Sequence, residues 1–275
     1  MYHHVKKLMY TVNIGTPDPK FGNMLLEQFG GANGELAAAM QYSIQGFNCE
    51  DPARKDLLMD IGTEELSHLE IVGALIRMHL KPMKNDRAAA EADPLVAIAG
   101  GGGVSLNNSV GDAWTADYLK ITGDLAVDLR SNIAAEARAK IVYERLINVT
   151  DDPGIQEALG FLMTREIAHQ KSFEKALHSI QPNFPQGKLP GVPEYTSVYY
   201  KMSQGDDATR GPWNEGPDWK FVDSPEPAVD GGDGIATVNV SKGDVKVLQA
   251  MASRTASDAS SDPTTGADLG AGQAA

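Results

Sequence analysis

Apolar residues at helical spacing divide much of the chain into long segments. In the segment that begins at Asp51-Pro52 and ends before Pro82, the apolar positions fit a helix largely covered by neighbours; they are Leu57, Leu58, Ile61, Leu69, Ile71 and Val72. Asp-Pro at residues 51–52 and again at 152–153 is typical of an N-cap followed by a first-turn proline. The pattern predicts four helices long enough for a bundle, over residues 23–48, 52–80, 112–148 and 152–180.

The remaining segments lack this pattern. Residues 5–14 form a short β-leaning stretch, and a turn-rich break follows at residues 15–19, which predicts an N-terminal arm over residues 1–22. The connection over residues 81–111 is rich in glycine and proline, as a crossover between two helical hairpins would be. Prolines and aromatics alternate over residues 181–251, which predicts an irregular extension that wraps its own bundle or a neighbouring subunit. The small polar residues of 252–275 predict a disordered tail.

Composition excludes several classes of partner and location. The net charge of −13 leaves no basic stripe for nucleic acid and disfavours an anionic membrane surface. No stretch is apolar over the roughly 18 residues that a membrane-spanning helix needs, and the N-terminus lacks the apolar region of a signal peptide. Cys49 is the one cysteine, so no intrachain disulfide can form. We therefore expect a protein of the reducing cytoplasm.

Two Glu-x-x-His motifs carry the candidate chemistry. They are Glu65 to His68 and Glu166 to His169, each with its two ligands on one face of a helix. Chance predicts about 0.3 such pairs in a chain of this composition, which is the usual false-positive level of a short motif. The two motifs, however, are related by an offset of 101 residues.

The same offset relates other positions. It maps Glu35 onto Glu136, so each motif has a lone glutamate 30 residues before it, and it maps the first Asp-Pro onto the second. This arrangement indicates two copies of one helical hairpin. Four inward carboxylates and two imidazoles from four helices are the ligand set of a ferritin-like dinuclear metal bundle. The alternative is a set of scattered surface or capping residues.

The types of ligand atom narrow the choice of metal but do not determine the reaction. Four buried glutamates need cations to balance their charge. Carboxylate and imidazole ligands suit manganese and iron, while the absence of thiolates argues against a cysteine-rich zinc or iron–sulfur site. Ferroxidases, di-iron oxygenases and di-manganese enzymes share this spacing, so all three remain open at this point.

Five stretches resemble the non-haem manganese catalases: LLEQFGGANGELAAAMQY, GTEELSHLEIV, EARAKIVYERLINVT, FLMTREIAHQKSF and KMSQGDDATRGPWNEGP. The similarity extends from the N-terminal arm to about Trp219. The RGPWNEG stretch lies outside the predicted bundle, so the metal geometry does not demand it and it is the more specific marker. The resemblance implies disproportionation of hydrogen peroxide to water and O2 at two manganese ions.

The resemblance also implies a role for each site residue. Glu65 would bridge both ions; the remaining ligands would be Glu35 and His68 on one ion, and Glu136 and His169 on the other. Glu166 would be a catalytic base rather than a ligand. Tyr42 would donate to Glu136, although a core tyrosine bonded to any acceptor explains its position equally well.

The chain departs from the family pattern at two places. Some manganese catalases have an arginine just before the third-helix ligand, where this chain has Ala135, so the approach to the metals would be wider or differently gated. Some relatives also bind calcium, and the matching positions here are Asp56, Asp60, Ser203 and Gly205. Lys201 stands where an asparagine would complete that site, and its positive charge argues against calcium.

Two other functions remain as alternatives: a di-iron oxidase or ferroxidase in which Glu166 is a ligand, and a non-catalytic metal-storage protein. The resemblance implies a homohexamer. Two further side chains receive structural interpretations. His79 near a helix end is expected to be a favourable cation, and Glu64 is expected to point about 100° away from Glu65.

Overall fold

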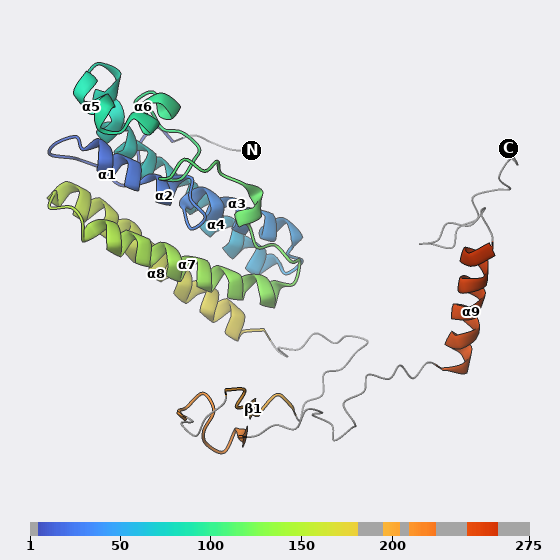
Figure 1. Ribbon diagram of the computed structural model, residues 1–275. Helices are drawn as coiled ribbons and strands as arrows, with labels where there is room; N and C mark the ends of the chain where they lie inside the picture. The colour runs from blue at the N-terminus through green and yellow to red at the C-terminus, as the bar shows by residue number, and fades with distance from the viewer. Residues whose placement is uncertain (1–4, 181–194, 204–208, 224–240, 258–275) are drawn as a thin grey trace, which may run out of the picture. The chain divides into compact units, whose positions relative to one another are not determined.

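The computed structural model describes residues 5–180, 195–203, 209–223 and 241–257 (Figure 1). The chain divides into two compact units, Met1–Pro185 and Gln186–Ala275. The first unit is helical and holds all of the predicted metal ligands. Among the described helices, none is both long and apolar enough to cross a membrane.

Four long helices form the bundle of the first unit. They are α3 (Glu35–Asn48), α4 (Pro52–Leu80), α7 (Leu125–Ile147) and α8 (Pro153–His178). Helices α3 and α4 pack as one hairpin and α7 and α8 as the other, as the 101-residue offset predicted. Asp51 accepts a hydrogen bond from the Arg54 N–H, and Asp152 accepts from Gly154 and Ile155, so both predicted N-caps are confirmed.

The first predicted helix, over residues 23–48, is wrong as one element. The chain forms α1 (Pro19–Met24) and α2 (Leu26–Phe29), and it breaks before α3 begins at Glu35. Glycines in the break allow close backbone contacts: a Cβ on Gly30 would lie 2.5 Å from the Asn107 carbonyl oxygen, and one on Gly34 would lie 2.8 Å from that of Gln28. The glycines therefore permit a close approach of backbone segments at the point where the predicted helix is interrupted.

The third long helix begins later than predicted. Helix α7 starts at Leu125 rather than near Asp112, because Asp124 caps it by accepting from the Val127 N–H. The preceding loop contains a 3₁₀ turn, η2 (Ala116–Tyr118), and lies against α3. There, Gln45 donates to the Lys120 carbonyl at 2.7 Å and the Lys120 N–H donates to Gln41 at 2.7 Å. The loop is thus held against α3 by hydrogen bonds at Gln41 and Gln45.

The N-terminal arm and the crossover cover one end of the bundle. The described arm contains no strand: its β-leaning residues form an irregular segment with several bends, in which Tyr10 stacks on Phe161 with ring centroids 4.6 Å apart. The crossover carries three short elements, η1 (Lys81–Lys84), α5 (Arg87–Ala92) and α6 (Pro94–Gly100).

Two apolar clusters fill the bundle, one on either side of the predicted metal ligands. On α4 the first cluster contributes Leu58 and Ile61 and the second begins at Ile71, so Glu65 and His68 fall between them. On α8 the order is reversed: Leu162 of the second cluster precedes Glu166 and His169, and Phe173 of the first cluster follows them. The polar residues therefore form a buried layer across an otherwise apolar core.

The described part of the second unit holds a small parallel pair of strands and one helix. Strand β1 (Val198–Tyr200) pairs with β2 (Lys220–Val222), and Arg210 of the RGPWNEG stretch lies over the Phe221 ring, 4.4 Å from its centroid. Helix α9 (Lys242–Ser257) crosses the boundary at 251–252 that composition suggested, so an irregular chain up to residue 251 followed by a disordered tail is a wrong prediction there. The rest of the predicted extension and tail lies outside the described residues.

Candidate metal centre

Six buried side chains from the four long helices converge in two groups. Within each group, one nitrogen or oxygen atom from every member lies within 4.8 Å of the others. The first group is Glu35, Glu65, His68 and Glu166, and the second is Glu65, Glu136, Glu166 and His169. All the predicted ligands and the predicted base are therefore brought together, with Glu65 and Glu166 common to both groups.

Glu65 lies between the two histidines. Its Oε2 is 2.8 Å from Nδ1 of His68, and its Oε1 is 2.9 Å from Nδ1 of His169. The imidazole rings are nearly parallel, with centroids 5.5 Å apart. Each oxygen of one carboxylate thus faces a different imidazole, which is the arrangement that a shared carboxylate needs.

The other carboxylates extend the cluster on both sides. Nδ1 of His68 lies 3.6 Å from Glu35 and 3.4 Å from Glu166, and Nδ1 of His169 lies 3.8 Å from Glu136. Both histidines therefore present Nδ1 to the carboxylates.

Glu64 faces the opposite edge of both imidazoles. One of its oxygens is 3.4 Å from Nε2 of His68, and the other is 3.2 Å from Nε2 of His169. Arg165 donates from Nε to Glu64 at 2.6 Å. The sequence reading gave Glu64 only a structural or surface role, although the 101-residue offset, which pairs Glu64 with Arg165, was a signal that could have found it.

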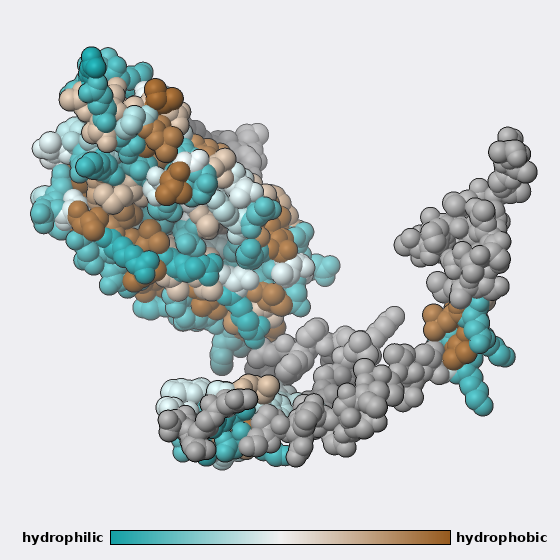
Figure 2. Space-filling view, in the orientation of Figure 1, coloured by the Kyte–Doolittle hydropathy of each residue, from teal (hydrophilic) through white to brown (hydrophobic). Residues whose placement is uncertain are grey.

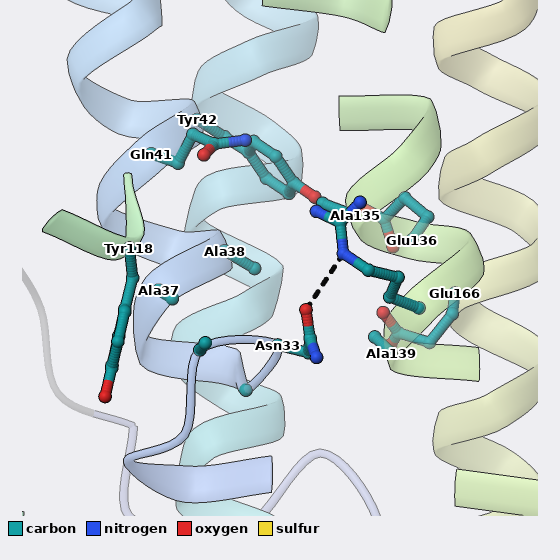
Figure 3. Close-up of a pocket in the computed structure, with 13 residues that line it drawn as sticks. Asn33, Ala37, Ala38, Gln41, Tyr42, Tyr118, Ala135, Glu136, Ala139 and Glu166 are labelled. Atoms are coloured by element: carbon teal, nitrogen blue, oxygen red, sulfur yellow. Dashed lines mark hydrogen bonds between the residues drawn. The ribbon is translucent and has the colours of Figure 1, made fainter. Parts of the chain in front are cut away.

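Two buried tyrosines contact the cluster. Tyr143 donates its hydroxyl to Glu35, a contact that the sequence reading missed. Tyr42 extends from α3 toward Glu136 (Figure 3), and burial, followed by the nearby Glu136, raises the pKa of its hydroxyl. Within the described residues, the Tyr42 hydroxyl has no hydrogen-bond partner.

The electrostatics of the cluster call for cations. Burial, reinforced by neighbouring carboxylates, raises the pKa of Glu35, Glu136 and Glu166. Burial alone would also raise the pKa of Glu65, but contacts with His169 and His68 lower it to about 2. Burial opposes the charged form of His169, yet Glu64 and Glu65 raise its pKa to about 9. Protons therefore neutralise the excess negative charge when no metal is bound.

Several donor atoms of the cluster are buried without a hydrogen-bond partner among the described residues. They are Glu65 Oε1, both carboxylate oxygens of Glu136, Glu166 Oε1, His68 Nε2 and both ring nitrogens of His169. Unpaired buried polar atoms are costly, and divalent cations would satisfy the oxygens and the Nδ1 atoms at once. Oxygen and imidazole donors suit manganese or iron, so the residues present fit a dinuclear centre.

The residues that match a calcium site are divided between the two units of the chain, so that site stays a prediction. Asp56 and Asp60 are exposed on α4, and neither belongs to the acidic clusters found among the described residues. Ser203 is exposed, Gly205 lies outside the described residues, and Lys201 forms an ion pair with Asp223 at 3.3 Å.

The prediction that His79 is a favourable cation at a helix end is wrong. Its side chain is fully buried, and Nδ1 accepts a hydrogen bond from the Asp18 N–H at 2.9 Å. An accepting Nδ1 requires a ring that is not doubly protonated, and burial lowers the pKa of His79. The N-terminal arm, which covers this end of α4, is the reason that the helix-end rule fails here.

A four-helix bundle whose core holds this carboxylate and histidine cluster defines a ferritin-like dinuclear metalloprotein. The chain also matches a family model, "manganese containing catalase", over residues 1–274. It therefore belongs to the manganese catalase family.

Individual relatives agree with this assignment. A probable manganese catalase of Clostridium acetobutylicum is 41% identical over 205 residues, which cover 74% of this chain and 91% of that protein. A manganese catalase of Bacillus subtilis is 32% identical over 234 residues, covering 78% of this chain and 85% of that protein. The crystal structure of KatB, a manganese catalase from Anabaena PCC7120, matches with a TM-score of 0.72 and 45% identity, covering 81% of this chain and 99% of that one.

The family assignment confirms three predictions: the ferritin-like fold, the di-manganese cofactor and the disproportionation of hydrogen peroxide to water and O2. None of these comparisons favours the di-iron oxidase or ferroxidase alternative.

Proposed function

We propose that the buried cluster holds two manganese ions and that Glu65 is shared between them. The position of Glu65, with one oxygen toward each histidine, carries this assignment. The other ligands are Glu35 and His68 for one ion, and Glu136 and His169 for the other. When bound, the metal pair supplies a reversible two-electron change that lets one peroxide be oxidised and a second be reduced.

The charge balance of the centre favours five protein ligands over six. Two divalent ions and three ligating carboxylates leave a net charge of +1, which attracts an anionic form of the substrate. Coordination by Glu166 as well would remove this charge. A free Glu166 is therefore the arrangement that favours peroxide binding.

Glu166 is the proton carrier in this proposal. Its Oε1 is buried without a partner among the described residues, and its side chain lines the cavity that leads into the site. Burial raises the pKa of its carboxyl, followed by the charge of Glu65. A carboxyl with a raised pKa can take a proton from entering peroxide and return it to the departing water.

Neighbouring side chains hold the ligands in place. Tyr143 fixes Glu35 through a hydrogen bond, and Tyr42 is placed to donate to Glu136. Glu64, anchored by Arg165, lies 3.4 Å from Nε2 of His68 and 3.2 Å from Nε2 of His169, where its charge favours one orientation of each imidazole. Such partners orient metal ligands and raise their basicity.

Two variants test the roles of the glutamates. Glu65→Ala should lose both manganese binding and O2 release, whereas Glu166→Gln should keep its manganese and lose O2 release. Glu174→Gln on the outer face of α8 is the control, because its side chain contacts only Gln170 in the hydrogen bonds found there. Manganese loss from Glu166→Gln equal to that from Glu65→Ala would contradict the proposal and make Glu166 a ligand.

A homohexamer is the proposed assembly. Large apolar side chains are exposed near α6, where Leu95 is 57% and Ile98 is 87% exposed (Figure 2). Trp213 of the RGPWNEG stretch is 60% exposed in the single chain. Contacts between subunits would cover such surfaces. Light scattering should give a mass six times 29.4 kDa, and a monomer mass would contradict the proposal.

A cytoplasmic location accompanies this function. The single cysteine, Cys49, is free and half-buried, as suits a reducing compartment. Cell fractionation should find the protein with cytoplasmic markers, and enrichment in a secreted fraction would contradict the proposal.

A further inference from the structure

A narrow cavity reaches the metal cluster between α3 and α7. Its volume is about 20 Å³, which is on the scale of a single water molecule. Glu136 and Glu166 line its inner part, together with Tyr42 and Ala135 (Figure 3). With alanine at position 135, this approach is nevertheless narrow, so some other side chain must restrict it.

A much larger cavity of about 630 Å³ lies outside the narrow one. It is formed by the outer face of α7 and the loop that carries Asp117 and Lys120. Ala32, Asn33, Tyr118 and Arg138 line both cavities, so these residues stand at the junction between them.

One hydrogen bond crosses this junction. Arg138 donates from Nε to Oδ1 of Asn33 at 2.9 Å, the dashed line in Figure 3. Asn33 belongs to the glycine-rich segment between α2 and α3, and Arg138 lies on α7, one turn after Ala135. The bond therefore joins the two sides of the passage.

The two sides of the passage differ in how easily they can move. The glycine-rich backbone is packed closely, since a Cβ on Gly34 would lie 2.8 Å from backbone atoms of Gln28. The Arg138 side chain is exposed and flexible, and an exposed hydrogen bond of this kind is broken and remade at small cost. Of the two partners in this bond, Arg138 is thus the one whose side chain can more easily move aside.

We propose that Arg138 and Asn33 form a gate between the outer cavity and the metal cluster, which admits molecules of the size of peroxide and hinders larger ones. This inference rests on the proposed function of the cluster. Arg138 acts on access to the site and not on the reacting atoms. A hydrogen bond that only tied the loop to α7 would affect stability and leave selectivity by size unchanged.

The test compares how fast two anions of different width enter the manganese-loaded full chain. Azide is linear and narrow, whereas acetate is broader, and both carry one negative charge. Stopped-flow absorption gives the two association rates in the parent protein, Asn33→Ala, Arg138→Ala and the control Arg145→Ala, whose side chain is exposed on α7 outside both cavities. Dividing the acetate rate by the azide rate cancels the effect of the lost charge in Arg138→Ala.

We expect the acetate-to-azide ratio to rise about five-fold in both gate variants, the change that loss of one hydrogen bond produces in the population of the open state. The ratio should stay constant in Arg145→Ala. An unchanged ratio in both gate variants, or an equal rise in the control, would overturn the gate. O2 release by the parent protein is measured on the same sample, so a parent that binds both anions without releasing O2 would contradict the proposed function separately. Two variants on opposite sides of the passage keep the test decisive if one of them folds poorly.

Discussion

Glu64 and Arg165 occupy equivalent positions of the two helical hairpins, 101 residues apart, and they pair across the bundle at 2.6 Å. The pair breaks the symmetry of the repeat, because a carboxylate stands on one side and a guanidinium on the other. The carboxylate faces Nε2 of both His68 and His169. In the proposed centre, one residue thus lies against a histidine ligand of each metal.

Glu64→Gln should weaken manganese binding by about 10- to 100-fold, the usual effect of removing a partner that orients metal-binding histidines. The amide keeps the size of the side chain but loses the charge that both imidazole N–H groups face. Titration of the metal-free protein with Mn²⁺, followed by calorimetry, measures the effect. Glu144→Gln, which disrupts the pair with Lys140 on the surface of α7, is the control and should bind as the parent does. Equal affinity in Glu64→Gln and the parent would refute the positioning role.

Removal of the metals should make the stability of the protein depend strongly on pH. Glu35, Glu136 and Glu166 have raised pKa values in the folded metal-free chain, and so has His169, at about 9. The folded metal-free chain therefore binds more protons than the unfolded chain, and its stability falls as pH rises. Glu65, with a pKa of about 2, is ionised in both states above about pH 5 and does not alter this sign.

The measurement is the thermal midpoint of the metal-free and metal-loaded protein between about pH 5 and pH 8. The gap between the two midpoints should widen toward pH 8, since bound cations replace the protons in the loaded form. A sample reloaded after chelation controls for damage. A gap independent of pH would mean that the cluster is not neutralised by protons when metal is absent.

His79 should make the stability of the protein depend on pH in the opposite direction. Its pKa is lowered in the folded protein, so it contributes stability above the unfolded value of 6.5, and this contribution is lost as pH falls. His79→Asn retains an acceptor near the position of Nδ1 but cannot titrate. The fall in thermal midpoint from about pH 7 to about pH 5 should therefore be smaller in this variant than in the parent. His178→Asn, at the exposed end of α8, should behave as the parent. A fall in His79→Asn as steep as in the parent would show that His79 is not the titrating group.

The sequence predicted most of the site because its information is local and repeated. Asp51 and Asp152 cap helices through neighbouring N–H groups, and spacing within a helix fixes the shared face of Glu65 and His68. The repeat then supplied Glu35 and Glu136, which no short motif marks.

The errors came from contacts between distant segments. Gly30 breaks a predicted helix where the backbone of Asn107 approaches, and the arm that contains Asp18 covers His79. A helical wheel gave the direction of Glu64 relative to Glu65, but it did not show that His169 of another helix lies across from it. Such packing follows from the tertiary structure and is absent from any local pattern.

The most direct test of the central claim is O2 release from hydrogen peroxide by the purified protein, with manganese and iron counted on the same sample. The cluster of Glu65 and its neighbours predicts rapid O2 release with about two manganese ions per chain. Bound iron without O2 release would contradict this account and assign the same ligands to a di-iron oxidase.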